Sequence, residues 1–337
     1  MNRPALVRLL IGIAISVVFL AVTLSRVNLA AAGDAIAKAA PAGLLAALGI
    51  VIVDLGLRAL RWQLLLQGVH GAATRPSYRL AVGYLTIGFT ANAVLPARLG
   101  DVARAILAGA AFRTPRLAIF GTIMIERLGD GLTMLALALV SSVVVAGIAE
   151  LRDLVAFALV AGVAGVIALA IGWLVVSRSG AASTRVGTVV AGVGRRLAAG
   201  AGTMTTVRGA AAVVILTLTV ACTAMLVAWT VSSAVGVNLS APQVVLFTSG
   251  IALSLAIPAA PGALGTYEFV GVAIVTSLGF TPEQGLATIL LMRILSTFPP
   301  ALAGLVSLWV LQVRPSALVD GAGDDSAGDL PSVEPAR

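Results

Sequence analysis

Hydrophobic residues gather in runs long enough to cross a bilayer, separated by short polar segments. A helix needs about 20 predominantly apolar residues to span the hydrocarbon core. Spanning helices are therefore predicted at about residues 6–25, 41–66, 115–146, 154–176, 210–235 and 283–313. The first run, which follows Arg3 and Arg8, is interpreted as an uncleaved first helix. The last run is expected to bend at Pro299 and Pro300, because proline removes a helical hydrogen bond.

Two further apolar stretches, residues 80–111 and 243–278, are each broken by a Pro-x-x-Leu-Gly segment, at 96–100 and 261–265. The limbs after the breaks, 102–111 and 267–278, are too short to span. They favour two re-entrant hairpins that enter from opposite faces, with the breaks near the midplane; tilted full spans with kinks remain the alternative. An arginine follows the two glycines after 27 or 28 residues, at Arg127 and Arg293.

This repetition predicts an all-α polytopic membrane protein with inverted-repeat architecture, about six spanning helices and two re-entrant helical hairpins. The repeat halves are expected at about 41–147 and 210–313, within one transmembrane domain that covers 1–314. The Gly/Asp/Ser/Pro-rich residues 315–337 are expected to form a disordered tail.

Composition supports the bilayer and excludes other classes of protein. The chain is 59% hydrophobic and 11% charged, and its mean hydropathy is +1.07. Its net charge of +8 does not indicate nucleic acid, because most arginines flank apolar runs, as topology signals do. A single cysteine and a single histidine give no basis for a disulfide framework or a metal site, and no cofactor is expected.

The placement of basic residues predicts orientation. With the N-terminus inside, the inner segments hold most of the arginines, in 1–8, 58–79, 113–116 and 178–208 and at Arg314. The outer segments hold only Arg26, Lys38 and Arg152. This positive-inside pattern predicts a multi-pass protein of the bacterial inner membrane with both termini cytoplasmic. The segment 177–208 is expected to be either a helix on the membrane surface or a loop.

Eight charged residues remain at membrane depth after the loop charges are set aside. Four are basic and four acidic: Arg98, Asp101, Arg104, Glu126, Arg127, Asp130, Glu268 and Arg293. Each would cost roughly 2.5 to 3.5 kcal/mol at the centre of a helix, so mutual pairing in a wet or protein-lined interior is expected. Together with Asn92, they are the candidate substrate-binding residues. The alternative is that they only fasten hairpins to helices.

Arginines hold phosphate by paired hydrogen bonds, which suits a lipid headgroup that crosses while its tails stay in the bilayer. Enzyme chemistry has less support. The sequence contains no Gly-x-Ser-x-Gly, His-Glu-x-x-His or P-loop motif, and no catalytic residue is assigned. We therefore do not expect an enzyme.

Several motifs together resemble a known family. They are Asn92-x3-Pro96-x-Arg98-x-Gly100-Asp101-x2-Arg104, Glu126-Arg127-x2-Asp130, Pro261-Gly262-x-Leu264-Gly265-x2-Glu268 and Arg293, with Arg58-x2-Arg61-Trp62 upstream. The chain resembles the transmembrane domain of the lysylphosphatidylglycerol synthase/flippase family over about residues 5–314. The resemblance implies a flippase-like protein. The soluble synthase domain has no counterpart here, so synthase activity is not expected.

The leading hypothesis is translocation of an anionic or zwitterionic phospholipid, or of a polyprenyl-phosphate-linked lipid, between leaflets. Its headgroup is expected near Arg98, Arg127 and Arg293, held between the two halves. The alternative is a membrane partner of a lipid- or glycan-modifying enzyme that transports nothing. A lipid headgroup is thus the expected ligand, a lipid- or glycosyl-transfer enzyme is the partner under the alternative, and no nucleic acid is expected.

Overall fold

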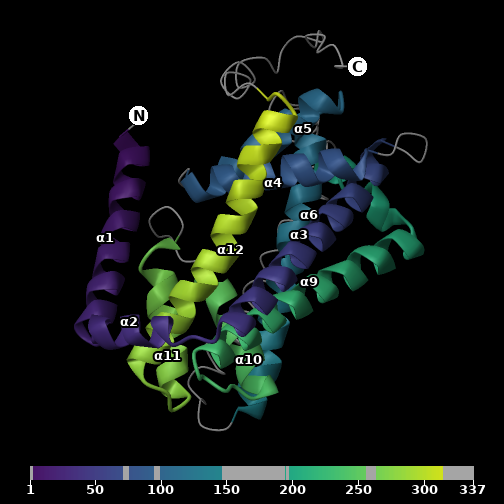
Figure 1. The fold of residues 1–337 in the computed structure, drawn as a ribbon. Coiled ribbons are helices and arrows are strands. Elements are labelled where there is room, and N and C mark those ends of the chain that lie inside the picture. Colours follow the sequence, from purple (N-terminus) through teal and green to yellow (C-terminus); the bar gives the residue numbers. More distant parts are fainter. Residues whose placement is uncertain are drawn as a thin grey trace, which may run out of the picture. The chain divides into compact units, whose positions relative to one another are not determined.

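The elements described by the computed structural model are all helices (Figure 1). The structure describes residues 3–70, 76–94, 99–145, 194, 197–255 and 263–313. Within those residues no strand occurs, so the all-α prediction is confirmed for this part of the chain. The predicted helix at 154–176, most of the segment 177–208 and the tail 315–337 lie outside the described residues.

Five long helices coincide with predicted runs. They are α1 (Arg3–Ser25), α3 (Pro41–His70), α6 (Arg116–Val144), α9 (Val207–Ala234) and α12 (Pro282–Val310). The helix α2 (Leu29–Ala37) was not predicted. The Asn28 side chain starts it by accepting hydrogen bonds from the backbone N–H groups of Ala30 and Ala31 at 3.0 and 3.2 Å.

Three of these helices are long and apolar enough to cross a membrane: α3, α9 and α12. A fourth span is counted if α1 and α2, bent by 82° at their junction, form one broken span. The helix α6 has 29 residues but carries Glu126, Arg127 and Asp130. The described residues thus define a multi-pass membrane protein, and the predicted number of six spans is not confirmed. The helix α12 continues through Pro299 and Pro300, where the expected bend stays a prediction.

The chain forms two compact units. Unit 1 contains Met1–Leu55, Asp130–Gly162 and Leu218–Pro299, and unit 2 contains Gly56–Gly129, Val163–Thr217 and Pro300–Arg337. Each unit contains one of the two broken stretches. The two units are defined by contacts in space, so they do not test the repeat halves predicted at 41–147 and 210–313.

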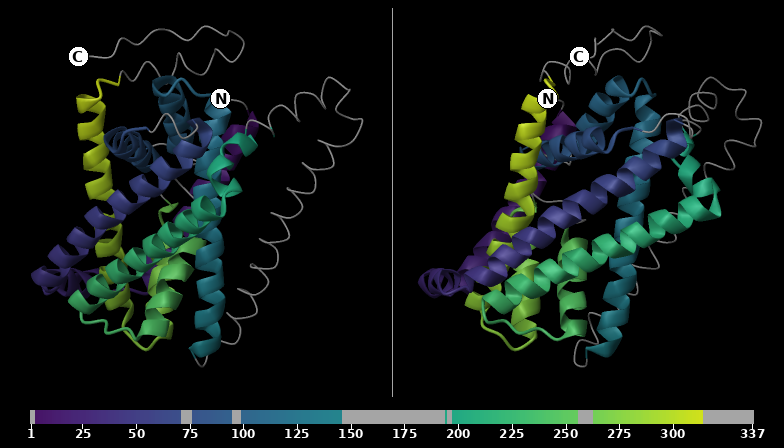
Figure 2. Two further views of the ribbon diagram at one scale, coloured as in Figure 1. Left: turned by 90° about the vertical axis from the view of Figure 1, so that its right-hand side faces the viewer. Right: turned by 45° about the vertical axis from the view of Figure 1, so that its right-hand side comes forward.

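Unit 1 has an apolar core in which the second broken stretch takes part. Its limbs are α10 (Ala241–Ser254) and α11 (Thr266–Ser277), which pack against each other (Figure 2). Phe247 and Val275 are fully buried in this core. The helix α1 packs on α11, where the ring centroids of Phe19 and Phe269 lie 4.7 Å apart. This packing fixes the start of α11, where a candidate carboxylate lies.

Unit 2 holds the first broken stretch as an antiparallel pair of helices, α4 (Tyr78–Val94) and α5 (Leu99–Ala111). Gly88 of α4 faces Arg104, while Gly100 of α5 faces Asn92, so the contacts run in opposite directions. At 13 residues α5 is about 20 Å long, shorter than a hydrocarbon core of about 30 Å. A hairpin requires this pairing, whereas a kinked single span would keep its limbs apart. Entry of either hairpin into the membrane stays a prediction.

Gly100→Ala is expected to destabilise the protein by about 1–3 kcal/mol, the usual cost of overpacking. A Cβ at Gly100 would collide with the carbonyl oxygen of Gly88 and the backbone of Asn92, which leaves α5 no room to approach α4. Thermal unfolding in detergent would measure the effect. The control is Gly33→Ala on α2, where a Cβ meets open space and the melting temperature should stay or rise. Equal melting temperatures for both variants would contradict the close approach.

Candidate functional site

The start of α5 is shaped by a side chain from α4. The backbone N–H of Gly100 donates to Asn92 Oδ1 at 2.9 Å, and Asn92 Nδ2 donates to Asp101 Oδ1 at 3.2 Å. Asn92 therefore satisfies one of the N–H groups that a helix start leaves without an intrahelical partner. It also turns the Asp101 carboxylate toward the next long helix, α6.

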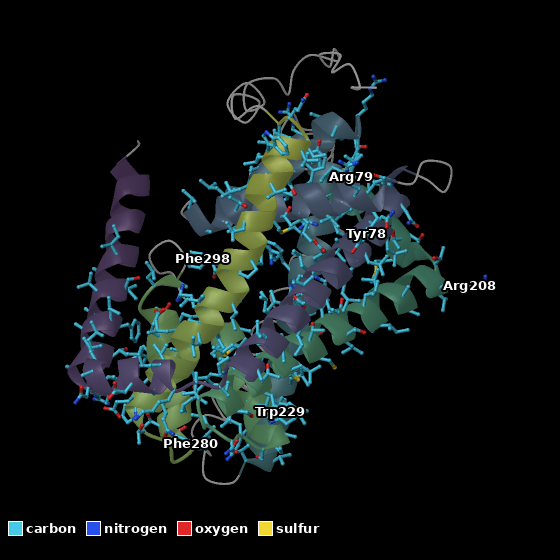
Figure 3. The ribbon with its side chains drawn as sticks, viewed as in Figure 1. Tyr78, Arg79, Arg208, Trp229, Phe280 and Phe298 are labelled. Carbon is cyan, nitrogen blue, oxygen red and sulfur yellow. The ribbon has the colours of Figure 1, made fainter. Side chains whose placement is uncertain are left out.

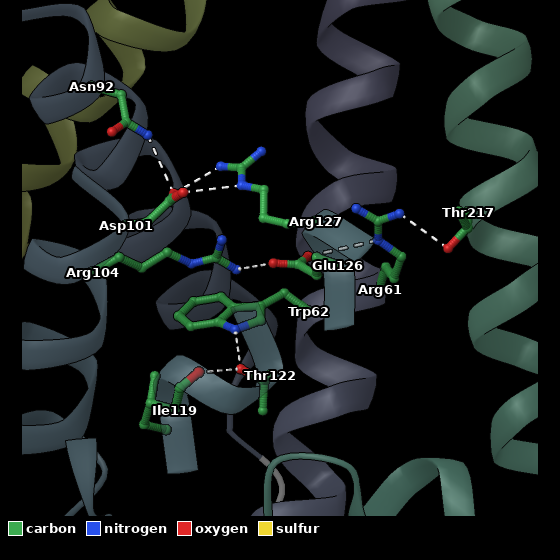
Figure 4. Close-up of polar contacts among 10 residues, drawn as sticks. All are labelled: Arg61, Trp62, Asn92, Asp101, Arg104, Ile119, Thr122, Glu126, Arg127 and Thr217. Atoms are coloured by element: carbon green, nitrogen blue, oxygen red, sulfur yellow. Dashed lines mark hydrogen bonds and ion pairs between the residues drawn. The ribbon is translucent and has the colours of Figure 1, made fainter. Parts of the chain in front are cut away.

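Asp101 pairs with Arg127 of α6 through two hydrogen bonds (Figure 4). Arg127 Nε donates to Oδ2 at 3.0 Å and its NH2 group donates to Oδ1 at 2.7 Å. This is the planar, bidentate arrangement in which arginine binds carboxylates and phosphates most strongly. The Arg127 side chain keeps 30% of its surface exposed and that of Asp101 keeps 10%. Arg127 is therefore partly accessible, whereas Asp101 is buried.

A second, deeper group of charges lies in the same unit. Glu126 Oε2 lies 2.9 Å from an Arg104 terminal nitrogen and its Oε1 lies 3.6 Å from Arg61 Nε. All three side chains are at most 5% exposed. Arg61 also donates to Thr217 Oγ1 of α9 at 3.1 Å. These contacts join α3, α5, α6 and α9.

The Trp62 ring supports this group from one side. The guanidinium carbon of Arg104 lies 3.6 Å from the ring centroid, a cation–π geometry. The indole Nε1 donates to Thr122 Oγ1 at 3.0 Å, so the buried ring has no unsatisfied donor. Trp62 thereby fixes the orientation of Arg104 from a third helix, α3.

Arg61 and Trp62 belong to this group although the sequence did not predict them as site residues. From the sequence, Arg61 was expected to be an orientation charge near the inner end of a helix over residues 41–66. The helix α3 continues to His70, and Arg61 is 2% exposed. The Arg58-x2-Arg61-Trp62 motif in the family resemblance was the available signal. The spacing of residues along the helix gave no signal for Arg61, because its partners come from other helices.

Unit 1 contains a corresponding pair. Arg293 Nε of α12 lies 2.6 Å from Glu268 Oε1, and Glu268 Oε2 accepts from the backbone N–H of Gly265 at 2.7 Å. Gly265 has a φ of +85°, which a residue with a side chain rarely adopts. The guanidinium of Arg293 also lies 4.3 Å from the Tyr267 ring centroid and its NH2 group donates to Ala263 O at 3.4 Å. The Arg293 side chain is 20% exposed.

The Asp101–Arg127 and Glu268–Arg293 pairs have the same arrangement. Asp101 and Glu268 are each the third residue of the short helix after a break, and each binds an arginine of the next long helix. The matching places predicted for Arg127 and Arg293 therefore have a structural counterpart within each unit. Each arginine contacts a carboxylate of its own unit. A headgroup held by both arginines stays a prediction.

Two candidate residues remain, Arg98 and Asp130. Arg98 lies outside the described residues. Asp130 is half-buried one turn beyond Glu126 on α6 and belongs to unit 1, and its role stays a prediction. Among the described residues, no three His, Cys, Asp or Glu side chains lie close enough together to hold a metal ion.

The spans and the buried ion pairs together define a class of protein: a multi-pass α-helical membrane protein whose apolar helices enclose paired charges. Polar groups of this kind within a membrane domain mark substrate paths or structural fastenings. The chain belongs to the family described as the lysylphosphatidylglycerol synthase transmembrane region, whose model matches residues 9–304. A comparison with curated proteins found no match.

Proposed function

We propose that the protein moves a lipid with a phosphate-containing headgroup between the two leaflets of the membrane. The observation that carries this proposal is the repeated arginine–carboxylate pair at the start of the short helix after each break. A fastening alone needs no charge, because serine or asparagine would hold two helices at lower cost. A charged, partly exposed arginine in each unit is what a phosphate requires.

Exposure separates the arginines into two groups. Arg127 and Arg293 keep 30% and 20% of their side chains exposed, while Arg61 and Arg104 keep 2%. The first two are therefore the arginines that touch the headgroup. The buried two, with Glu126, hold α3, α5 and α6 in register around Asp101. A protein that only scaffolds an enzyme has no use for accessible arginines at such positions.

The proposed substrate is an anionic or zwitterionic phospholipid, or a polyprenyl-phosphate-linked lipid, and the reaction forms and breaks no covalent bond. Its acyl or polyprenyl tail stays in the bilayer while the headgroup passes along the polar residues. Membership in the lysylphosphatidylglycerol synthase transmembrane family supports a flippase-like role.

Reconstitution in liposomes tests the proposal directly. Fluorescent phosphatidylglycerol, phosphatidylethanolamine, phosphatidylcholine and a polyprenyl phosphate would be compared one at a time, and leaflet transfer would be read by quenching the outer leaflet. At least one of them is expected to transfer faster than in protein-free liposomes of the same composition. If all four transfer at the protein-free rate, the alternative of a membrane partner without transport is favoured.

We further propose that both termini and residues 67–77 and 177–208 face the cytoplasm of a bacterial cell. The helix α9 offers a test at its two ends, since it is long enough to span and Arg208 projects from its start (Figure 3). In a Cys222→Ser background, Asn238→Cys should react with an impermeant thiol reagent added to spheroplasts, and Thr205→Cys should react only after lysis. Both replaced side chains are exposed. The opposite labelling pattern would reverse the orientation.

A further inference from the structure

The carboxylate of Asp101 is bound as an external oxyanion would be. Its two oxygens take both donors of the Arg127 fork, at 3.0 and 2.7 Å, and Asn92 Nδ2 donates to it at 3.2 Å. A phosphate offers the same edge of two oxygens to a guanidinium group. Asp101 therefore occupies the Nε/NH2 edge of Arg127, an edge that suits a headgroup phosphate equally well.

A second arginine lies on the same helix as Asp101. Arg104 lies three residues from Asp101 on α5, and both side chains extend from the same face (Figure 4). Its side chain is only 2% exposed, its Nε has no hydrogen-bond partner, and its NH2 group lies 2.9 Å from Glu126 Oε2 as an ion pair. Arg104 therefore holds a second positive charge on the face of α5 that carries Asp101, while Arg127 is the arginine that a headgroup phosphate reaches.

Exchange of one anion for another would also allow the arginine to bind the substrate and then release it, as transport requires. A site that holds its substrate too tightly cannot release it, and one that leaves an arginine of a membrane domain without a counter-charge is costly to empty. If an internal carboxylate returns when the substrate leaves, the arginine keeps a partner throughout. Both loading and release then occur with little net change in free energy.

We propose that Asp101 is a built-in substitute for the phosphate oxyanion of the headgroup, and that the phosphate displaces Asp101 from Arg127 when the substrate binds. The inference rests on the proposed function and adds that the Asp101 carboxylate competes with the headgroup phosphate for Arg127. In unit 1, Glu268 holds Arg293 and the N–H of Gly265 in the corresponding way. The ligand class is an oxyanion of the phosphate or phosphodiester type.

Equilibrium dialysis of the purified protein against radiolabelled inorganic phosphate, in a neutral detergent, tests the competition. Asp101→Asn keeps the shape of the side chain but removes the competing charge. It is expected to bind phosphate about tenfold more tightly than the wild type, the worth of about one charge-assisted hydrogen bond. Asp34→Asn on α2 removes an exposed carboxylate and should leave phosphate binding unchanged. Equal or weaker phosphate binding by Asp101→Asn would overturn the inference.

A second variant tests the same competition between Asp101 and phosphate if Asp101→Asn does not fold. Asp101→Ser removes the competing charge with a shorter side chain and leaves the bond between Asn92 and the N–H of Gly100 in place. It should also tighten phosphate binding by about tenfold, because the competing carboxylate is lost. Unchanged or weaker binding by this variant would overturn the inference in the same way.

Nanodiscs distinguish a lipid headgroup from free phosphate as the source of the oxyanion. Phosphatidylglycerol should compete with labelled phosphate for Asp101→Asn, relative to protein-free discs of the same lipid. If phosphatidylglycerol does not compete, the site takes free phosphate and the headgroup assignment is overturned. Failure of the inference stays distinct from failure of the proposed function: Arg127→Ala would still stop lipid transfer while Asp101→Asn showed no gain in phosphate binding.

Discussion

Replacing Arg127 with alanine is expected to abolish lipid transfer between leaflets while the protein still folds and inserts. Arg127 is the most exposed arginine of the unit 2 group, and its fork is the only group that offers Asp101 two hydrogen bonds there among the described residues. Its loss removes the bidentate partner that Arg127 would offer a phosphate in unit 2. Truncating one partner of such a charged hydrogen bond commonly costs 2–5 kcal/mol, or about 30-fold to several thousand-fold in binding.

Arg293→Ala is expected to have the same effect through unit 1, because Arg293 makes the corresponding pair with Glu268. Lysine at either position should restore transfer only in part, since an ammonium group lacks the planar fork. The measurement is leaflet transfer in liposomes by the lipid that the wild-type protein moves fastest.

Arg208→Ala is the matched control for both variants. Arg208 is an exposed arginine in the first turn of α9 and projects from the helix (Figure 3). Its loss should leave transfer nearly unchanged. Wild-type transfer by Arg127→Ala and Arg293→Ala, or a loss of transfer explained entirely by degradation, would mean that these arginines only fasten helices and that the headgroup binds elsewhere.

Glu126→Gln should produce the largest loss of stability among single substitutions in unit 2. Glu126 lies between Arg61 and Arg104, and its side chain is 5% exposed. Its neutralisation leaves two buried guanidinium groups without the charge that faces them. Breaking a buried ion pair in this way costs about 3–5 kcal/mol. The melting temperature in detergent and the fraction of protein that elutes as a monodisperse species would measure the effect.

The control is Asp34→Asn, which also neutralises one carboxylate. Asp34 is exposed on α2, and the loss of an exposed charge of this kind should change stability by less than about 1 kcal/mol. A triple change that replaces Arg61, Arg104 and Glu126 with apolar residues of similar volume should recover much of the lost stability, because it removes the charges together. If Glu126→Gln melted at the wild-type temperature, the three charges would not hold unit 2 together.

Several features of the fold followed from local sequence. Apolar runs of spanning length predicted α1, α3, α6, α9 and α12 to within a few residues at most ends, since backbone groups in lipid must be satisfied within a helix. The proline- and glycine-containing breaks predicted where α4 and α5 separate and where α11 begins. The short helix α2 was missed, because the single cap residue Asn28 is a weak signal within an apolar stretch.

The candidate site was predicted only as a set of charges. The cost of a charge in the bilayer singled out Asp101, Arg104, Glu126, Arg127 and others without reference to any partner. The spacing of these charges along the sequence did not predict which of them pair with each other. Asp101 and Arg127 are 26 residues apart, and Arg61 and Thr217 are 156 apart. Such pairs form because several helices pack side by side, which no periodicity along the chain encodes.

The sequence by itself therefore determined that this chain lies in a membrane, where its helices break, and which charges are too costly to be accidental. These properties depend on the transfer of each segment from water to lipid, which is a local quantity. The tertiary structure alone decided that Glu126 joins two buried arginines over Trp62 while Asp101 and Glu268 hold the accessible ones. That division depends on which helix faces meet, and only close packing between distant segments sets it.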